Sequence, residues 1–432
     1  MDKHQELYEQ ASQYLVGGIS SSFRIHPGLG RPFYLSRGDG SKVYDLDGRE
    51  YIDLCTSHGA SLLGHNHPKI NEAVQKAVEM GTLCSYETPY HSQLARRICE
   101  MVPCAELVRF TGSGTEATMH TIRLAREYTG KDIIVKFEGH FHGYHDYLQF
   151  NWHPEVGPPE FGVPRPPVIE SGGMPKGIEQ YIIVLPFNDE AAIERTLTER
   201  KDEIAAVILE PINYNAGCIL PAEGYLEQLR ELTAENDVLL IFDEVLSGFR
   251  TGPGCAQEHF GVTPDLCTLG KCLGGGLPLS AFAGKGEIME HVAPLGPSTH
   301  SGTYNGHLFQ VMAGLAALRE ISKAGFYEPI YQLSDRLYGG TQEIFHRAKI
   351  KARVQGLGAR FGFYFGLDHE VKDYWRAAQK DEQLENRFFA AAIKHGVYLH
   401  HGWHHGFSAA HTVEDIDRAL VGMEAAAREV AG

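Results

Sequence analysis

The stretch Val238-Leu239-Leu240-Ile241-Phe242-Asp243-Glu244 sets five apolar residues directly before two carboxylates. A short apolar run of this kind predicts a strand that is buried on both faces. A carboxylate at the end of such a strand is costly unless a cation or hydrogen-bond donors meet it. Because α/β proteins place ligands at the carboxyl ends of parallel strands, Asp243 is a candidate binding residue. The alternative is that Asp243 only caps nearby backbone amides.

Five further apolar runs accompany this stretch, and helical patterns separate them. They cover residues 105–110, 133–137, 182–185, 205–209 and 266–269. Continuous apolar runs that alternate with helices predict a mostly parallel sheet covered on both faces, which is an α/β domain. A single core rarely grows beyond about 250–300 residues. Because the chain has 432 residues, we expect a second, smaller domain.

The two ends of the chain predict that smaller domain. Residues 42–46 and 51–54 alternate around the turn Asp47-Gly48, a pattern typical of a hairpin. Beyond residue 311, amphipathic helices are interrupted by apolar runs at 361–365 and 396–399, which predict an α+β domain. We expect residues 1–60 to pack with it, residues 61–305 to form the large domain and residues 306–432 the small one. The Gly- and Pro-rich segment 146–176 is long for a connection, as lids and binding loops are.

Composition and charge exclude several classes of protein. The net charge of -16 argues against a nucleic-acid partner. The polar amino terminus lacks the apolar core of a signal peptide, and no apolar run approaches the roughly 18 residues of a membrane helix. The eight cysteines form no CxxC pair, so we expect free thiols and a cytoplasmic protein that does not bind membranes.

A glycine cluster, Thr111-Gly112-Ser113-Gly114-Thr115-Glu116, follows the run at 105–110 and opens a helical pattern. A strand, a tight glycine turn and a helix N-terminus form a cradle for an anion, because free backbone N–H groups and the helix dipole point at the bound group. The alternative is an ordinary strand-to-helix turn with a Ser or Thr cap.

Lys271 follows the run at 266–269 and lies between Gly270 and the glycines 274–276. A lysine in this setting is poorly explained as a solvated surface charge. The glycines allow a planar ligand to approach the backbone, and a partly desolvated lysine becomes a nucleophile and a proton shuttle. A helix N-terminus for a phosphate, Asp243 for a ring nitrogen and Lys271 for an aldehyde together describe pyridoxal phosphate.

The chain resembles the class III aminotransferases of the fold type I pyridoxal-phosphate enzymes over nearly its whole length. The nearest branch is that of the glutamate-1-semialdehyde aminomutases, which includes β-amino-acid aminotransferases. The motifs that carry the resemblance are residues 63–68, 113–117, 137–139, 142–143, 209–211, 242–245, 248–250, 269–271 and 301–303. The resemblance implies a large domain with a mostly parallel seven-stranded sheet, a smaller α+β domain and a homodimer.

The resemblance also implies the role of each cofactor residue. Lys271 forms the Schiff base and moves the substrate proton, and Asp243 keeps the pyridine nitrogen protonated. Val245 lies against one face of the ring and Phe141 against the other. The further implied contacts are Ser113, Gly114 and Thr115 at the phosphate, His142 beside the stacking ring, Asn215 near the phenolic oxygen, and Thr303 at the phosphate of the neighbouring subunit.

Substrate recognition is expected to differ from that of the aminomutases. Arg24 matches an arginine that holds the substrate carboxylate, which a planar guanidinium suits. His58 stands where the aminomutases have Trp, and His404 or His405 takes the place of a glutamate. Losing that acidic partner argues against the diamino intermediate that an aminomutase must retain. We therefore expect transfer of an amino group from an amino acid, preferably a β-amino or aromatic β-amino acid, to a 2-oxo acid with formation of pyridoxamine phosphate.

Three alternatives accompany this prediction. The first is an isomerase, either an aminomutase of the semialdehyde type or an amino-acid epimerase. The second is a non-catalytic binding module that has kept the fold. The third is a metal site in the dense histidines, but zinc sites need defined spacing, so we expect no metal.

Overall fold

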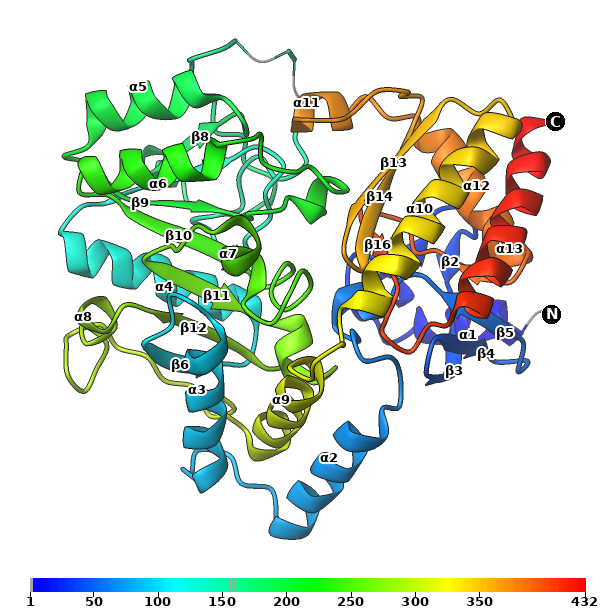
Figure 1. Cartoon of the computed structure of the whole chain (residues 1–432), viewed down its shortest axis with the longest axis horizontal. Helices are drawn as coiled ribbons and strands as arrows, with labels where there is room; N and C mark the ends of the chain where they lie inside the picture. Colours follow the sequence, from blue (N-terminus) through cyan, green and yellow to red (C-terminus); the bar gives the residue numbers. More distant parts are fainter. Residues whose placement is uncertain (1–2, 156, 159) are drawn as a thin grey trace. The chain divides into compact units, whose positions relative to one another are not determined.

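The computed structural model describes residues 3–155, 157, 158 and 160–432 (Figure 1). Contacts divide the chain into a large unit, residues 68–327 and 371–378, and a small unit, residues up to 67, 328–370 and 379–432. We expected the large domain to end at residue 305. The helix α9 (Leu308–Ile321) belongs instead to the large unit, because it packs against α2 (Pro68–Met80) and α3 (Pro89–Met101).

A seven-stranded sheet forms the centre of the large unit, in the order β6-β12-β11-β10-β9-β7-β8 (Figure 1). All neighbouring strands are parallel except β12, which runs antiparallel to β11 and β6. This confirms the predicted mostly parallel α/β sheet, and each predicted run forms a strand. The strands are β6 (Leu107–Thr111), β7 (Ile133–Phe137), β8 (Ile182–Leu185), β9 (Ile204–Leu209), β10 (Leu239–Glu244), β11 (Leu266–Leu269) and β12 (Ser280–Gly284).

The strand β12 was not predicted. Its sequence, Ser-Ala-Phe-Ala-Gly, consists mostly of small residues with weak strand preference. It is nevertheless buried throughout, because it fills the place between β11 and β6. Close packing there explains the small residues: a Cβ atom on Gly284 would lie 2.5 Å from the Asp265 carbonyl oxygen.

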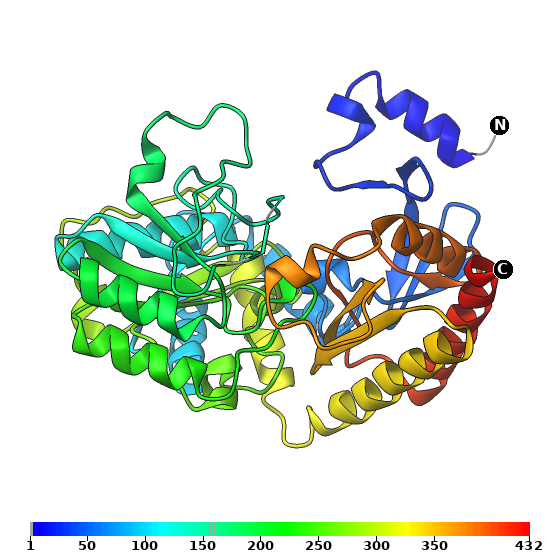
Figure 2. The ribbon, with the colours of Figure 1, turned by 90° about the horizontal axis from the view of Figure 1, so that it is seen from above.

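Helices cover both faces of this sheet. The helix α4 (Gly114–Thr129) packs across β9, β11 and β12, and α6 (Tyr225–Glu235) packs on β10 with α5 (Glu190–Arg200) beside it. Figure 2 shows α4, in cyan, on one face and the green helices α5 and α6 on the other. The remaining helices are α7 (Cys255–Phe260), α8 (Gly286–Met289) and α11 (Tyr374–Ala377).

The expectation of amphipathic helices beyond residue 311 holds for the small unit but not for α9. Residues on every side of α9 are buried, including the four consecutive residues Val311, Met312, Ala313 and Gly314. A helix that is apolar all round is one that neighbours surround on all sides, as α2, α3 and the turn after β11 do here.

Three small sheets, one of them the two-stranded pair β1-β2, and a layer of helices form the small unit. The predicted hairpin is present as β4 (Lys42–Asp45) and β5 (Glu50–Asp53), in a sheet of order β15-β5-β4-β3, and another sheet has the order β13-β14-β16. Figures 1 and 2 show α10 and α13 side by side, and they pack together. The predicted α+β character is confirmed. The other elements are α1 (Lys3–Ala11), β1 (Ile25–His26), β2 (Arg31–Pro32), β3 (Leu35–Asp39), α10 (Glu328–Arg347), β13 (Ala352–Leu357), β14 (Arg360–Phe365), α12 (Glu382–Lys394), β15 (Val397–Tyr398), β16 (His405–Gly406) and α13 (Val413–Ala431).

Two further expectations concern the long loop and the membrane. Apart from residues 156 and 159, which lie outside the described residues, the segment 146–176 contains neither helix nor named strand. It is joined to the sheet of the large unit by an isolated bridge between Arg165 and Val184, a residue of β8. Among the described residues, none of the helices has both the length and the apolar composition needed to cross a bilayer.

Candidate active site

Asp243 is the next-to-last residue of the buried strand β10 and is only 4% exposed. One of its oxygens accepts hydrogen bonds from Thr268 Oγ1, at 2.8 Å, and from the Val245 amide, at 3.1 Å. Thr268 lies on β11 directly beside Asp243 in the sheet register. Neighbouring strands therefore supply the donors that a buried carboxylate requires.

The second oxygen of Asp243 bonds to His142. His142 Nδ1 lies 2.7 Å from Asp243 Oδ2, and the histidine ring is fully buried. Burial lowers the pKa of His142, although the carboxylate acts in the opposite direction. A neutral ring that donates from Nδ1 leaves a lone pair on Nε2. Among the described residues, His142 Nε2 has no hydrogen-bond partner.

Lys271 begins a short turn of 3-10 helix directly after β11. Its backbone φ is 45°, in the left-handed region that side chains other than glycine rarely adopt. Such strain costs on the order of 1–3 kcal/mol and gathers at functional sites. The strand before it is fully buried, whereas Lys271 itself is half-buried. The chain therefore holds this lysine at the rim of the core.

The glycine cluster forms the predicted turn and helix start. Ser113 is the N-cap of α4, and its side chain accepts a hydrogen bond from the Glu116 amide. The first amide groups of a helix have no acceptor within the helix, so those of Gly114 and Thr115 are available to an anion. Behind them, Thr115 Oγ1 accepts a hydrogen bond of 3.2 Å from the Tyr144 amide.

Val245 lies close to both the glycine turn at Ser113–Thr115 and the turn at Gly270 and Lys271. A Cβ atom on Gly114 would lie 3.0 Å from Val245 Cγ1, and one on Gly270 would lie 3.1 Å from the same atom. Both glycines are thus required by the close approach of three segments. The structure places Ser113–Thr115, Asp243–Val245 and Gly270–Lys271 around one point of the large unit.

Glu210, which follows β9, holds two further predicted residues. Its carboxyl accepts hydrogen bonds from the Phe141 amide and from Asn215 Nδ2, both at 2.9 Å. Burial, and then the charge of Asp243, raise the pKa of Glu210 to about 8. The Phe141 ring contacts Tyr144 and Trp152. Phe141 and Asn215 therefore belong to the same cluster as Asp243.

Lys136 is a residue of this region that sequence analysis missed. It lies within β7, is fully buried, and donates to the carbonyls of His140, at 3.0 Å, Leu148 and Phe150. Burial lowers the pKa of its amine to about 7. Lys136 thus fixes the inner side of the loop that carries Phe141. Its signal was a lysine inside a strand predicted to be buried on both faces.

This arrangement fits pyridoxal phosphate. The helix N-terminus at Gly114 suits a dianionic phosphate, and the buried carboxylate of Asp243 suits a protonated ring nitrogen. Lys271 offers the primary amine that an aldehyde needs. Thr303, predicted to serve a neighbouring subunit, is exposed in this chain, and Ser85 Oγ donates a hydrogen bond to its carbonyl. Its role stays a prediction.

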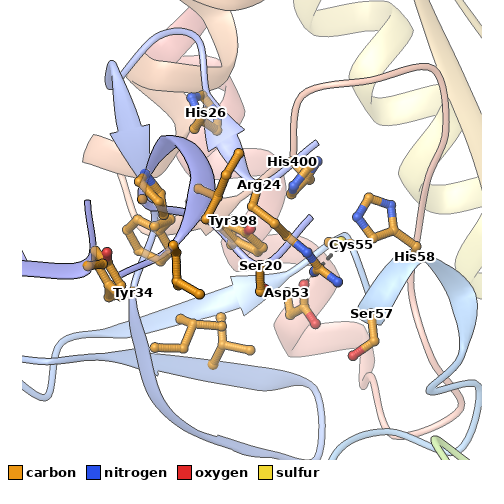
Figure 3. A pocket seen from close by; sticks show the side chains of 18 of the residues that line it. Ser20, Arg24, His26, Tyr34, Asp53, Cys55, Ser57, His58, Tyr398 and His400 are labelled. Atoms are coloured by element: carbon orange, nitrogen blue, oxygen red, sulfur yellow. Dashed lines mark hydrogen bonds between the residues drawn. The ribbon is translucent and has the colours of Figure 1, made fainter. Parts of the chain in front are cut away.

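The predicted substrate residues lie in the small unit, around a cavity of about 530 Å³ (Figure 3). Arg24, His58 and His400 point into this pocket, and Asp53 and Tyr398 line it with them. Asp53 is already engaged, because it accepts hydrogen bonds from the Cys55 and Thr56 amides and lies 2.6 Å from His65 Nε2.

The two histidines that competed for the glutamate position have different surroundings. His404 lies against His58, with ring centroids 5.9 Å apart. His405 belongs to β16 and is fully buried among Phe361, Phe363 and Phe389. The structure therefore places His404 behind the pocket wall and His405 in the core of the small unit. In the described part of the chain, no three His, Cys, Asp or Glu side chains are grouped so that they could hold a metal ion.

Comparison with known proteins identifies the family of the chain. A family model described as aminotransferase class III matches residues 27–415. A glutamate-1-semialdehyde 2,1-aminomutase of Methanocaldococcus jannaschii is 43% identical over 399 residues, which cover 92% of this chain and 91% of that protein. Among solved structures, an omega-transaminase from Sphaerobacter thermophilus is 32% identical with a TM-score of 0.93, over 99% of this chain and 98% of the other. A β-phenylalanine aminotransferase from Variovorax paradoxus is 29% identical with a TM-score of 0.84, over 98% and 93%.

These likenesses bear differently on the finer predictions. The relatives by sequence support the aminomutase alternative better than the favoured β-amino-acid aminotransferase, whereas the structural neighbours include transaminases. The family model covers most of the chain, and the predicted enzyme class, fold and cofactor are confirmed at that level. The chain belongs to the class III aminotransferases, a family of enzymes that depend on pyridoxal phosphate.

Proposed function

We propose that this enzyme transfers an amino group from a carboxylate-bearing amino acid to a 2-oxo acid. The observation that carries the proposal is the convergence of Lys271, Asp243 and the helix start at Gly114 in the large unit. These three groups meet the three needs of a transferase cofactor: a primary amine, a carboxylate for a ring nitrogen and donors for a phosphate.

When bound, pyridoxal phosphate supplies the sink for the electron pair left on the substrate carbon. Lys271 Nζ would take the proton from the substrate carbon next to the amine and pass it to the C4′ carbon of the bound cofactor. Such positioned acid–base catalysis contributes about 10²–10⁴-fold. Asp243 retains a proton on the ring nitrogen, and Thr268 and His142 fix the orientation of this carboxylate. Arg24 binds the carboxylate of the substrate.

Transfer between two molecules is favoured by the chemistry of the small-unit pocket. Asp53 is the one acidic residue among the described lining residues, and amides and His65 already occupy its oxygens. A pocket without a spare carboxylate offers little to hold a second ammonium group, which an aminomutase must retain between its two half-reactions. For the amino donor we favour β-amino acids, aromatic ones included, which the similarity to a β-phenylalanine aminotransferase supports.

Aminomutation is the second candidate, and a specific observation favours it. Seven relatives with 39–43% identity are glutamate-1-semialdehyde 2,1-aminomutases. In that reaction one molecule gives and receives the amino group, and no separate oxo acid is needed. An epimerase would likewise act on one substrate.

Half-reactions separate these functions. The loaded enzyme is mixed with β-phenylalanine alone, and absorbance follows conversion of the cofactor to its amino form. We expect a stoichiometric conversion that a 2-oxo acid then reverses. Steady turnover of a single amino substrate without an oxo acid, with glutamate-1-semialdehyde as the test compound, would establish the isomerase instead. The same absorbance assay with α-amino acids and simple amines shows which class of donor the enzyme prefers.

We further propose that the enzyme is a homodimer in which Thr303 contacts the phosphate of the partner's cofactor. Thr303 is exposed, and so is the next residue, Tyr304. Tyr86, which follows the Ser85 that bonds to Thr303, is exposed as well. Substituting Thr303→Val in a mixed dimer with Lys271→Ala tests this arrangement. If Thr303 acts across the subunits, one active site of this dimer contains both substitutions and the other contains neither, so that one site keeps wild-type activity.

A further inference from the structure

Three consecutive residues of the small unit, Thr56, Ser57 and His58, adopt the left-handed backbone conformation, with φ of 49°, 54° and 51°. None is glycine, and Thr56 is β-branched, for which this conformation is a true outlier. Strain of this kind costs on the order of 1–3 kcal/mol per residue and persists only where the surroundings enforce it. The turn ends on Ser57 and His58, both of which line the pocket with Arg24 (Figure 3).

Two buried charged side chains enforce this turn. Asp53 accepts hydrogen bonds from the amides of Cys55, at 2.8 Å, and Thr56, at 3.1 Å. From the other side, Arg360 Nη1 donates to the Cys55 carbonyl and to Thr56 Oγ1, both at 3.1 Å. Arg360 is fully buried on β14. A carboxylate thus holds the amides of the turn, and a guanidinium holds its oxygens.

The second arm of Arg360 reaches a histidine behind the pocket wall. Arg360 Nη2 donates to His404 Nδ1. Because a guanidinium has donors only, His404 must present a lone pair at Nδ1 and carry its proton on Nε2. Adding a second proton would set an N–H group against the guanidinium. The His404 ring contacts His58 edge to face, and His58 in turn contacts His400 with centroids 4.5 Å apart.

The other groups around the pocket leave Arg24 as its unpaired positive charge. Among the described lining residues Arg24 is the only arginine or lysine. Burial lowers the pKa of His400, and lowers that of His26 to about 4. His65 lies against the Asp53 carboxylate. The rest of the lining is largely apolar, and includes Leu15, Ile19, Phe33, Leu35 and Val43.

We propose that Arg360 is a positioning residue that sets substrate specificity: it fixes the strained turn that carries His58 and holds a neutral His404 behind it, so that the pocket accepts one carboxylate, at Arg24, next to an apolar group. The inference rests on the proposed function, because it treats this pocket as the place of the substrate carboxylate. It names the substrate class as monocarboxylates with an apolar substituent and excludes dicarboxylates, for which the pocket offers no second cation.

Binding of two probes without an amine tests the proposal. Calorimetry of the loaded enzyme near neutral pH compares 3-phenylpropanoate, with one carboxylate, and benzylsuccinate, which adds a second carboxylate to the same frame. We expect the monocarboxylate to bind at least about tenfold more tightly, since an unpaired buried charge costs more than the 1.4 kcal/mol of a tenfold change. Arg24→Ala should weaken both probes about tenfold or more. Equal or tighter binding of benzylsuccinate, or unchanged binding in Arg24→Ala, would overturn the proposal.

Two variants test the part played by Arg360. Arg360→Lys keeps the charge but removes the planar guanidinium, whose two terminal nitrogens bond to the turn and to His404. We expect the affinity for 3-phenylpropanoate to fall about tenfold. His404→Leu cuts only the arm to the histidines and leaves the bonds to Cys55 and Thr56, so it remains informative if Arg360→Lys does not fold. We expect it to lower the preference for the monocarboxylate about threefold to tenfold. Arg336→Lys, at an exposed arginine paired with Asp417, is the control.

Wild-type affinity and selectivity in both Arg360→Lys and His404→Leu would contradict the proposal. Neither probe reacts, so the outcome does not depend on turnover. If the half-reactions fail while the probes behave as expected, the proposed function falls and the pocket inference stands. If the half-reactions succeed and the probes show no preference, the proposed function stands and the pocket inference falls.

Discussion

The cofactor site of the large unit and the pocket of the small unit are built in opposite ways. Asp243 and Lys271 stand at the carboxyl ends of adjacent parallel strands, β10 and β11, whose pairing fixes where they lie. Arg24 and His58 stand on irregular segments, and His58 is held in strained backbone by side chains from elsewhere in the chain. Regular backbone thus positions the groups for the shared chemistry, whereas side-chain contacts position those for the substrate.

This difference predicts that substitutions in the two regions have separable effects. Changes at the strand ends should affect cofactor retention and the rate of chemistry. Changes around the pocket should affect affinity and substrate preference while the cofactor stays bound. The substitutions that follow test whether these effects are separate, beginning with the one whose expected effect is largest.

Replacing Lys271 by Ala should abolish transfer, with a loss of at least about 10³-fold in kcat, because both the covalent anchor and the proton shuttle are removed. The absorbance band of the lysine-bound cofactor should disappear as well. Lys136→Met, at a fully buried lysine of the same unit, is expected to keep that band. Retention of the band and of turnover in Lys271→Ala would contradict the assignment.

Arg24→Ala should raise KM for β-phenylalanine about 10–150-fold, because hydrogen bonds to a charged group contribute about 1.5–3 kcal/mol. KM for 1-phenylethylamine, which lacks the carboxylate, should change little, and cofactor absorbance should be retained. Arg37→Ala, at an exposed arginine over Tyr44, is the matched control. Equal effects on the two donors would remove Arg24 from carboxylate binding.

Glu210→Gln should change how stability depends on pH. Burial raises the pKa of Glu210 in the folded protein to about 8, whereas the ordinary pKa of a glutamate is 4.5. The folded state therefore binds more protons between these values, and the contribution of Glu210 to the free energy of unfolding falls as pH rises through this window.

A glutamine has no such proton. Denaturant unfolding should show the variant gaining about 1–3 kcal/mol relative to wild type between about pH 5 and about pH 7. Lys136 adds nothing there, because below its folded pKa of about 7 it is protonated in both states. Glu199→Gln on the surface of α5 is the control. A difference that stays constant with pH would show that Glu210 is ionised throughout.

Thr268→Val should have the smallest effect, a loss of about fivefold in kcat/KM, corresponding to one hydrogen bond of about 1 kcal/mol to Asp243. The valine has the same shape, so the core of the sheet should be retained. We expect substrate preference to stay as in wild type. A changed ratio of kcat/KM between β-phenylalanine and 1-phenylethylamine would contradict the prediction that changes at the strand ends leave substrate preference unaffected.

The cofactor site could be predicted because local patterns determine it. A buried strand with a polar residue at its carboxyl end places that residue at a ligand-binding edge, which holds for Asp243 and Lys271. Ser113 follows a strand that contains Arg109 and is only partly buried, and there the glycine turn carried the signal. Lys136 carried the same kind of signal, a lysine inside an apolar run, and was overlooked. The small strand β12 carried little signal, because its burial follows from its neighbours and not from its own residues.

The pocket was harder to predict because its contacts are distant in sequence. Arg360 meets Thr56 across 304 residues and His404 across 44, and nothing in the sequence Ala359-Arg360-Phe361 marks a buried guanidinium. The choice between His404 and His405 depended on one position of register. Neighbouring residues along a strand face opposite sides, so β16 turns His405 into the phenylalanine core and leaves His404 outside the strand.

The central claim is that Lys271 bonds to the cofactor. Reduction of the loaded enzyme with borohydride makes a carbon–nitrogen bond between a lysine and the cofactor permanent, and mass spectrometry of the digested protein then locates it. We predict the added mass on the peptide that contains Lys271 and on no other. The mass on another lysine, such as Lys136, or on none would contradict the account.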